Sequence, residues 1–142
     1  MRILALDLGT KTGYAISLQE SGVLDLARKR FEGGGFIFVR FREKLKELLD
    51  SGITQVYFEE VRRHLGTDAA HLYGGLLAVL SEECELRKLP YSGIPVGTIK
   101  KHATGKGNAN KDQMLQAAKN EGWNVYDDNH ADALWLLNFV TK

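Results

Sequence analysis

Short apolar runs near the start of the chain have the length and composition of β-strands. Residues 3–7, "ILALD", read as a buried strand, and "TGYAISLQ" and "GVLDLARKRFE" read as two further strands separated by the polar turn "ESG". Three strands connected in this way predict a meander at the beginning of the fold.

After three glycines at positions 33–35, apolar residues recur at helical spacing. An amphipathic helix that closes at residues 50–52 is predicted from Phe38, Phe41, Leu45 and Leu48. "TQVYFEE" then reads as a short buried strand that ends in acid. A long helix follows, capped by Thr67 and extending to about Leu86. Its predicted apolar face consists of Ala69, Tyr73, Leu76, Leu77 and Leu80.

Two glycines interrupt this long helix. Gly74 and Gly75 each cost about 1 kcal/mol relative to Ala, so we expect another helix or a second subunit to pack closely there. Beyond the helix, "PYSGIPV" contains the last short strand, and "TIKKHATGKGNANKDQMLQAAKNEGW" a loop with helical turns on either side. Residues 128–140 form the predicted final helix.

The order of elements, which is meander, helix, strand, helix, strand, helix, predicts an α/β fold with a mixed sheet covered by helices. A chain of 142 residues is of a size that forms one domain, residues 1–142. The longest apolar runs, such as "LLAVL", are too short to span a bilayer, so we expect a soluble protein with no membrane association. Cys84, the only cysteine, is expected to be a buried structural thiol, which suits a reducing cytoplasm.

Carboxylates follow several of the predicted elements. Asp7 ends the first strand and Glu59 and Glu60 end the fourth, and the start of the final helix carries Asp127, Asp128 and Asp132. Neighbouring strands bring their ends together, and a helix start that docks there adds its own acids. Three separate segments are therefore expected to deliver carboxylates to one rim of the sheet.

Each of these acids also has a structural interpretation. Asp7 suits a turn that bonds nearby amides, and Asp127 or Asp128 suits a helix cap. Adjacent residues of a strand point to opposite faces, so at most one of the two glutamates faces the site.

Asp132 fits a structural interpretation less well. It lies in the apolar run "HADALWLL", one turn beyond Asp128, where two like charges repel each other. A positive group is expected between them, and Mg²⁺, which prefers oxygen ligands, meets that requirement. Two such ions can activate water and stabilise the leaving oxygen of a phosphodiester. Zinc is disfavoured, because the histidines have no paired spacing and only one cysteine exists.

The net charge is only +1, so affinity for nucleic acid depends on local clusters of basic residues. Residues 98–111 contain no acid, and their basic side chains, around Gly105 and Gly107, are Lys100, Lys101, His102, Lys106 and Lys111. Arg62 and Arg63 follow the Glu59 strand, and Lys11 follows the first strand. Such segments bring ammonium groups and backbone amides to phosphates, although a solvated loop explains each of them equally well.

Four motifs together resemble the RuvC-like Holliday junction resolvases, in particular small phage-type members. They are "LALDLGTKTGYA", "VYFEEV", "IKKHATGKGNANK" and "DDNHADALWLL", and they span nearly the whole chain. The resemblance implies an RNase H-like fold, a mixed five-stranded sheet with helices on both faces. It also implies a homodimeric, Mg²⁺-dependent endonuclease, with Mn²⁺ able to substitute, that nicks four-way junctions or other branched DNA symmetrically. Such an enzyme works in the cytoplasm, that of the host if the chain is phage-encoded.

The resemblance assigns roles by position. Asp7 and Glu59, rather than Glu60, become the first two metal ligands, and Asp132 becomes the acid of the family's "ADAL" helix. Lys100 and Lys111 fall where the family has lysines important for DNA and catalysis. One position departs from the family's pattern of metal ligands: Asn129 stands where the family often has Asp or His. The neighbouring Asp128 is the alternative fourth ligand. The expected DNA contacts are Lys11, Arg62, Arg63, Lys100, Lys101, Lys106 and Lys111.

Three other interpretations stay open. "LDLGTKTG" also resembles the first phosphate loop of actin and sugar-kinase type ATPases, which need two lobes where this chain has room for one. A non-catalytic module that binds branched DNA leaves the Asp128–Asp132 pair unexplained. A related nuclease that cuts RNA–DNA hybrids or DNA ends fits the same motifs.

Overall fold

The predicted three-strand meander opens the fold, and the structure, a computed structural model, describes residues 1–142. Strands β1 (Ile3–Asp7), β2 (Lys11–Ala15) and β3 (Ser21–Asp25) pair in antiparallel fashion. The pattern predicts a third strand through Glu32, but β3 ends at Asp25 and residues 26–35 form a loop. The reason is local, because "ARKR" has no buried face that a sheet could cover, and all four residues are exposed.

Two further strands extend the sheet in parallel with β1. Strand β4 (Gln55–Glu60) pairs with β1, and β5 (Tyr91–Pro95) pairs with β4, which gives the order β3-β2-β1-β4-β5. The predicted mixed five-stranded sheet is confirmed. Because β1 and β4 are parallel and Leu6 lies opposite Phe58, their carboxyl-terminal ends meet at one rim.

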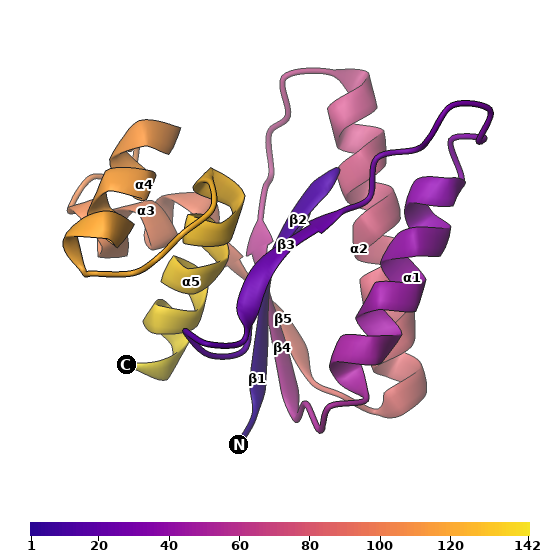
Figure 1. The fold of residues 1–142 in the computed structure, drawn as a ribbon, viewed down its shortest axis with the longest axis horizontal. Coiled ribbons are helices and arrows are strands. Elements are labelled where there is room, and N and C mark those ends of the chain that lie inside the picture. The colour runs from indigo at the N-terminus through magenta and orange to yellow at the C-terminus, as the bar shows by residue number, and fades with distance from the viewer.

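Helices cover both faces of this sheet, as predicted. In Figure 1, α1 (Phe36–Leu49) and α2 (Thr67–Arg87) lie on one side of the strands. The other side carries α3 (Val96–Thr104), α4 (Lys111–Asn120) and α5 (Asp128–Thr141). Helix α5 packs directly on β1 and β2. None of the helices combines the length and apolar character needed to cross a membrane.

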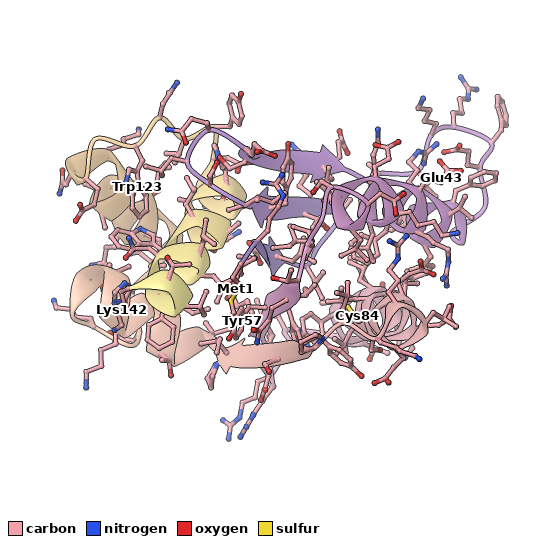
Figure 2. The ribbon with its side chains drawn as sticks, turned by 90° about the horizontal axis from the view of Figure 1, so that it is seen from below. Met1, Glu43, Tyr57, Cys84, Trp123 and Lys142 are labelled. Atoms are coloured by element: carbon pink, nitrogen blue, oxygen red, sulfur yellow. The ribbon has the colours of Figure 1, made fainter.

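Strand alternation sorts the side chains into two hydrophobic cores. Leu4 and Leu6 of β1 point toward α1 and α2, whereas Ala5 points toward α5. Figure 2 shows Cys84 within the α1–α2 layer and Trp123 on the opposite side of the molecule, beside α5. Asp7 has the same parity as Ala5, so its carboxylate faces the α5 side.

The structure modifies three expectations for α2. Thr67 is the first helical residue and not the cap, since Gly66 occupies that position in an extended conformation. Ala69, placed on the apolar face by its spacing, is exposed because the first turn extends beyond α1. The close packing expected at the glycines holds for Gly75, where an added Cβ would lie 2.4 Å from the Phe38 ring of α1. Gly74 faces open space.

Cys84 is fully buried, as expected for a structural thiol. Burial raises the pKa of this thiol to about 11. It therefore stays protonated at neutral pH and plays no part in the chemistry considered below.

Candidate metal centre and nucleic-acid interface

Three carboxylates from three separate elements converge at the rim. They belong to Asp7 at the end of β1, Glu59 near the end of β4, and Asp132 at the start of the second turn of α5. One oxygen from each lies within 4.8 Å of the others. The sequence prediction that three segments deliver acids to one rim is confirmed for these residues.

A glycine in β2 allows α5 to reach this position. Gly13 pairs with Asp7, and a Cβ at Gly13 would lie only 2.0 Å from the carbonyl oxygen of Asn129. The backbone at the start of α5 thus rests directly on the sheet where a side chain would otherwise stand. This contact brings Asp132 beside Asp7, and sequence reasoning missed it because the two segments are far apart in the chain.

A second anchor fixes the start of α5 to β3. Asp127 caps the helix by accepting from the His130 backbone N–H at 2.9 Å. The buried His130 ring accepts from the Tyr126 N–H at Nδ1, 3.0 Å away, so Nε2 carries the proton and donates to Ser21 Oγ at 2.8 Å. Burial lowers the pKa of His130, which keeps the ring neutral. His130 thus orients the helix and leaves no ring nitrogen for a metal.

Tyr73 of α2 holds the end of β4. Its hydroxyl donates to the Glu59 carbonyl at 2.9 Å and accepts from the Val61 N–H at 3.2 Å. Sequence analysis assigned Tyr73 only to an apolar face, and nothing in the local pattern revealed this role. The bonds fix the backbone from which the Glu59 side chain projects into the cluster.

Burial raises the pKa values of all three carboxyls, and repulsion from neighbouring acids adds to the rise for Asp7 and Asp132. Burial is the largest cause for Asp7, whose pKa lies well above its usual range, and Glu59 and Asp132 add to the rise. Burial also raises the pKa of Glu59, and it raises the pKa of Asp132 to about 8 with help from Glu59 and Asp128. Three such groups cannot all be charged side by side without a counter-ion.

A cation fits this cluster on structural grounds. Asp132 Oδ1 is buried without any hydrogen-bond partner, a state that costs free energy unless a positive group satisfies it. Three carboxylate oxygens within 4.8 Å of one another suit a hard divalent ion such as Mg²⁺ or Mn²⁺. The absence of nearby cysteine and of a free histidine nitrogen disfavours softer metals.

Asp128 lies at the border of the cluster. Its charge raises the pKa values of Asp7 and Asp132, yet its Oδ2 lies 3.9 Å from Lys111 Nζ. Asn129 turns away, because its side-chain amide donates to Asp127 Oδ2 at 3.4 Å. Of the two alternative ligands, only Asp128 presents a charge to the cluster.

The structure separates Glu59 from Glu60 as strand alternation predicts. Glu60 is directed to the opposite face, and its Oε1 accepts from Arg62 Nε at 2.6 Å. Arg62, a predicted DNA contact, is therefore paired but remains largely exposed. Arg63 is exposed in the same loop, with no ion pair.

The lysines form two groups. Lys100 and Lys111 lie near enough to the carboxylates to oppose part of the burial-driven rise in pKa of Asp132, and Lys100 also acts on Glu59. Lys101 and Lys106 are exposed and unpaired around α3, and Lys11 is exposed at the start of β2, opposite Asp25. The rim thus combines a buried acidic cluster with basic side chains around it.

Comparison with solved structures identifies the fold. Thermus thermophilus RuvC in complex with a Holliday junction substrate matches over 95% of this chain and 89% of its own, with a TM-score of 0.74 and 19% identity. A second Thermus thermophilus RuvC structure gives a TM-score of 0.68 at 18% identity, over 95% of this chain and 90% of its own. The yeast mitochondrial Holliday junction resolvase Ydc2 gives a TM-score of 0.59 at 16% identity, over 94% of this chain and 75% of its own.

No protein-family model and no curated protein matches the sequence. The structural likeness extends over nearly the whole chain, so the chain has a RuvC-like fold.

Proposed function

We propose that this chain is a Mg²⁺-dependent endodeoxyribonuclease that resolves Holliday junctions or other branched DNA by paired nicks. The observation that carries the proposal is the buried Asp7–Glu59–Asp132 cluster, with one unsatisfied oxygen, in a RuvC-like fold. A structure of that fold was solved with a Holliday junction.

In this proposal the carboxylates of Asp7, Glu59 and Asp132 hold the divalent ion, with Asp128 completing the site from its border. A divalent ion held by these carboxylates would supply the chemistry that activates water and stabilises the leaving oxygen of a phosphodiester. Fixed backbone supports at Gly13, His130 and Tyr73 keep the carboxylates in place, so little reorganisation is needed when the ion binds.

The basic residues are assigned by whether their charge acts on the cluster. Lys100 and Lys111 contact the scissile phosphate, where their charge offsets the charge that develops during the reaction. Lys11, Lys101, Lys106, Arg62 and Arg63 are exposed and contact the phosphates of the DNA arms. Base identity is not read by such contacts, which agrees with recognition of a branched shape.

Paired nicks need two active sites, and each chain carries one carboxylate cluster. The working unit in this proposal is therefore a homodimer that places one site on each of two strands. We propose that it acts in the cytoplasm, that of the host if the chain is phage-encoded, and that Mn²⁺ replaces Mg²⁺.

A cleavage assay with four substrates tests the proposal. The purified chain is incubated with a four-way junction, a linear duplex of the same arm sequence, an RNA–DNA hybrid and DNA with free ends, in Mg²⁺, in Mn²⁺ or in EDTA. Paired nicks confined to the junction and lost in EDTA are expected. Preferential cleavage of the hybrid or of DNA ends would indicate a related nuclease, and junction binding without cleavage in either metal would indicate a binding module. ATP hydrolysis is measured as a control.

A further inference from the structure

The loop of residues 26–35, which connects β3 to α1, carries three consecutive basic residues and an exposed aromatic ring that the proposed site does not use. Arg28, Lys29 and Arg30 are exposed, and Phe31 is 94% exposed. We name this segment the Phe31 loop. The sequence pattern predicts a strand here, but β3 ends at Asp25 and these residues lie in the loop.

The loop has a defined internal structure. Its only acid, Glu32, pairs with Arg40 of α1 and also accepts from the Lys29 N–H. Arg40 donates in addition to the Ala27 carbonyl at 3.3 Å. Glu32 is engaged by Arg40 and forms no ion pair with the three basic side chains at the tip, although the Lys29 charge helps Arg40 to lower its pKa and Arg28 donates to its carbonyl at 3.5 Å. No ion pair is formed by Arg28, Lys29 or Arg30.

Phe31 is held outward by an unusual backbone conformation. Its φ of +71° is left-handed, which is a genuine outlier for a bulky residue. The other non-glycine residue with positive φ, Lys88, ends α2, where this conformation is an ordinary helix termination. Phe31 ends no helix, and in this turn conformation its ring remains exposed.

One face of the projected ring is already covered. The Arg30 guanidinium lies 4.9 Å from the Phe31 centroid, in a cation–π contact. The other face is available to a flat partner, and apolar rings with adjacent Arg are the usual platforms on which nucleic-acid bases stack. A ring that is 94% exposed packs little against the rest of the fold and is open to a binding partner.

The Phe31 loop leaves the sheet at the same end as the carboxylate cluster, but on the α1 side, where Leu26 is buried in the α1–α2 core. The Leu26 N–H donates to the Thr10 carbonyl at 2.8 Å, in the turn that follows Asp7. In Figure 1 the loop rises at the top right, at the same end of the sheet as the connection from β4 to α2. Exposed Lys11 lies opposite Asp25, where the loop begins, and adds one further basic side chain at this end of the sheet.

We propose that the Phe31 loop is a second DNA-binding site, which contacts the phosphates of one arm through Arg28, Lys29 and Arg30 and stacks Phe31 on an unpaired or unstacked base at the branch point. The inference rests on the proposed function, since a branched substrate exposes bases that a continuous duplex keeps stacked. The basic residues then strengthen binding to every DNA, whereas Phe31 strengthens binding to branched DNA only.

Fluorescence anisotropy with a four-way junction and a linear duplex of the same arm sequence tests both parts. An Asp7→Asn background prevents cleavage during the measurement. Phe31→Ala is expected to weaken junction binding about tenfold and to leave duplex binding unchanged. The triple variant Arg28→Ala, Lys29→Ala, Arg30→Ala should weaken both, and lower the slope of log affinity against log salt by up to about 2.7.

Matched controls lie away from the rim. Leu86→Ala removes an exposed apolar side chain near the far end of α2, and three exposed lysines elsewhere give a charge-matched triple, Lys44→Ala, Lys46→Ala and Lys119→Ala. Leu86→Ala should leave both affinities unchanged, and the control triple should change the salt slope by less than the loop triple. Equal effects of the two triples would overturn the phosphate contacts.

A stacking signature completes the test. Phe31→Trp should retain junction affinity, and its added fluorescence should be quenched by the junction but not by the duplex. The stacking role would be overturned if Phe31→Ala left junction binding unchanged. It would also be overturned if Phe31→Ala weakened duplex and junction binding equally. Cleavage by the native chain is recorded separately, so a failure of the proposed nuclease function is distinguishable from a failure of this site.

Discussion

Two adjacent glutamates at the end of β4 differ only in the direction of their side chains, and this difference carries the first prediction. Glu59→Gln should lower junction cleavage about 100-fold or more, as should Asp7→Asn and Asp132→Asn, because each amide keeps the shape and loses the charge that holds the ion. Glu60→Gln should retain substantial activity, since Glu60 faces Arg62 on the other side of the sheet. Single-turnover rates on a four-way junction check this, with junction affinity as the control for folding. An inactive Glu60→Gln variant would show that Glu60, and not Glu59, belongs to the site.

Gly13 carries the second prediction, also at the scale of one residue. Gly13→Ala should lower cleavage about 100-fold, because the added methyl group overlaps the Asn129 carbonyl and displaces α5 together with Asp132. The same overlap should destabilise the fold by about 1–3 kcal/mol. Gly9→Ala is the matched control, as its Cβ would meet only the Lys11 carbonyl at an ordinary 3.7 Å. Chemical denaturation and single-turnover rates are measured for both variants, and equal rates would remove Gly13 from the positioning of the site.

The acids were predictable from the sequence because strand ends and strand alternation are local properties. Asp7 and Glu59 could be assigned to one rim and one face from residues within a few positions of each. Gly13 and His130 could not, since their roles depend on contacts with segments more than a hundred residues away in the chain. The roles of Gly13 and His130 both depend on the side of the sheet on which α5 packs.

At the scale of elements, the pattern located the five strands, α1, α2 and α5, and predicted only helical turns where α3 and α4 form, and the other errors fell at the ends of elements. The extended third strand failed because its charged second half has nothing to bury, and the Thr67 cap failed because Gly66 takes the extended backbone conformation that a cap needs. The end of an element depends on one or two residues and on neighbouring elements, whereas the existence of a helix or strand depends on the combined preferences of many residues. The Phe31 loop is one such case, since its first residues were predicted to continue the third strand.

The connection from α3 to α4 carries the third prediction. Asn110 and Gln113 form a capping box that fixes the start of α4, and hence Lys111, near the carboxylates, while Lys106 lies in the exposed turn before it. Lys111→Ala should therefore lower the turnover of bound junction about tenfold to 100-fold with a smaller effect on affinity. Lys106→Ala should do the reverse and lower the salt slope by about 0.9. Unchanged slopes and rates in both would make the segment a solvated loop.

For the whole molecule, the raised pKa values link folding stability to pH and to metal. Burial and neighbouring acids raise the pKa of Asp132 to about 8 from an ordinary value near 3.8 and raise that of Asp7, and burial raises that of Glu59. Between the ordinary pKa of a carboxyl group and its raised pKa in the folded chain, the folded chain binds more protons than the unfolded chain. Without metal, the contribution of these groups to stability is therefore present at low pH and falls as the pH rises toward 8.

A divalent ion should reverse this trend, because it binds the deprotonated carboxylates and only the folded chain assembles them. The fourth prediction is that the increase in melting temperature on adding Mg²⁺ grows from about pH 6 to about pH 9. Asp132→Asn should raise the melting temperature of the metal-free chain at the upper pH, since it removes a buried charge without a partner, and should abolish most of the response to Mg²⁺. Thermal unfolding in EDTA and in Mg²⁺ across this range measures both effects, with Glu60→Gln as the control that keeps the native response. A metal response that is equal at all pH values, or that survives Asp132→Asn, would mean that the ion does not bind at this cluster.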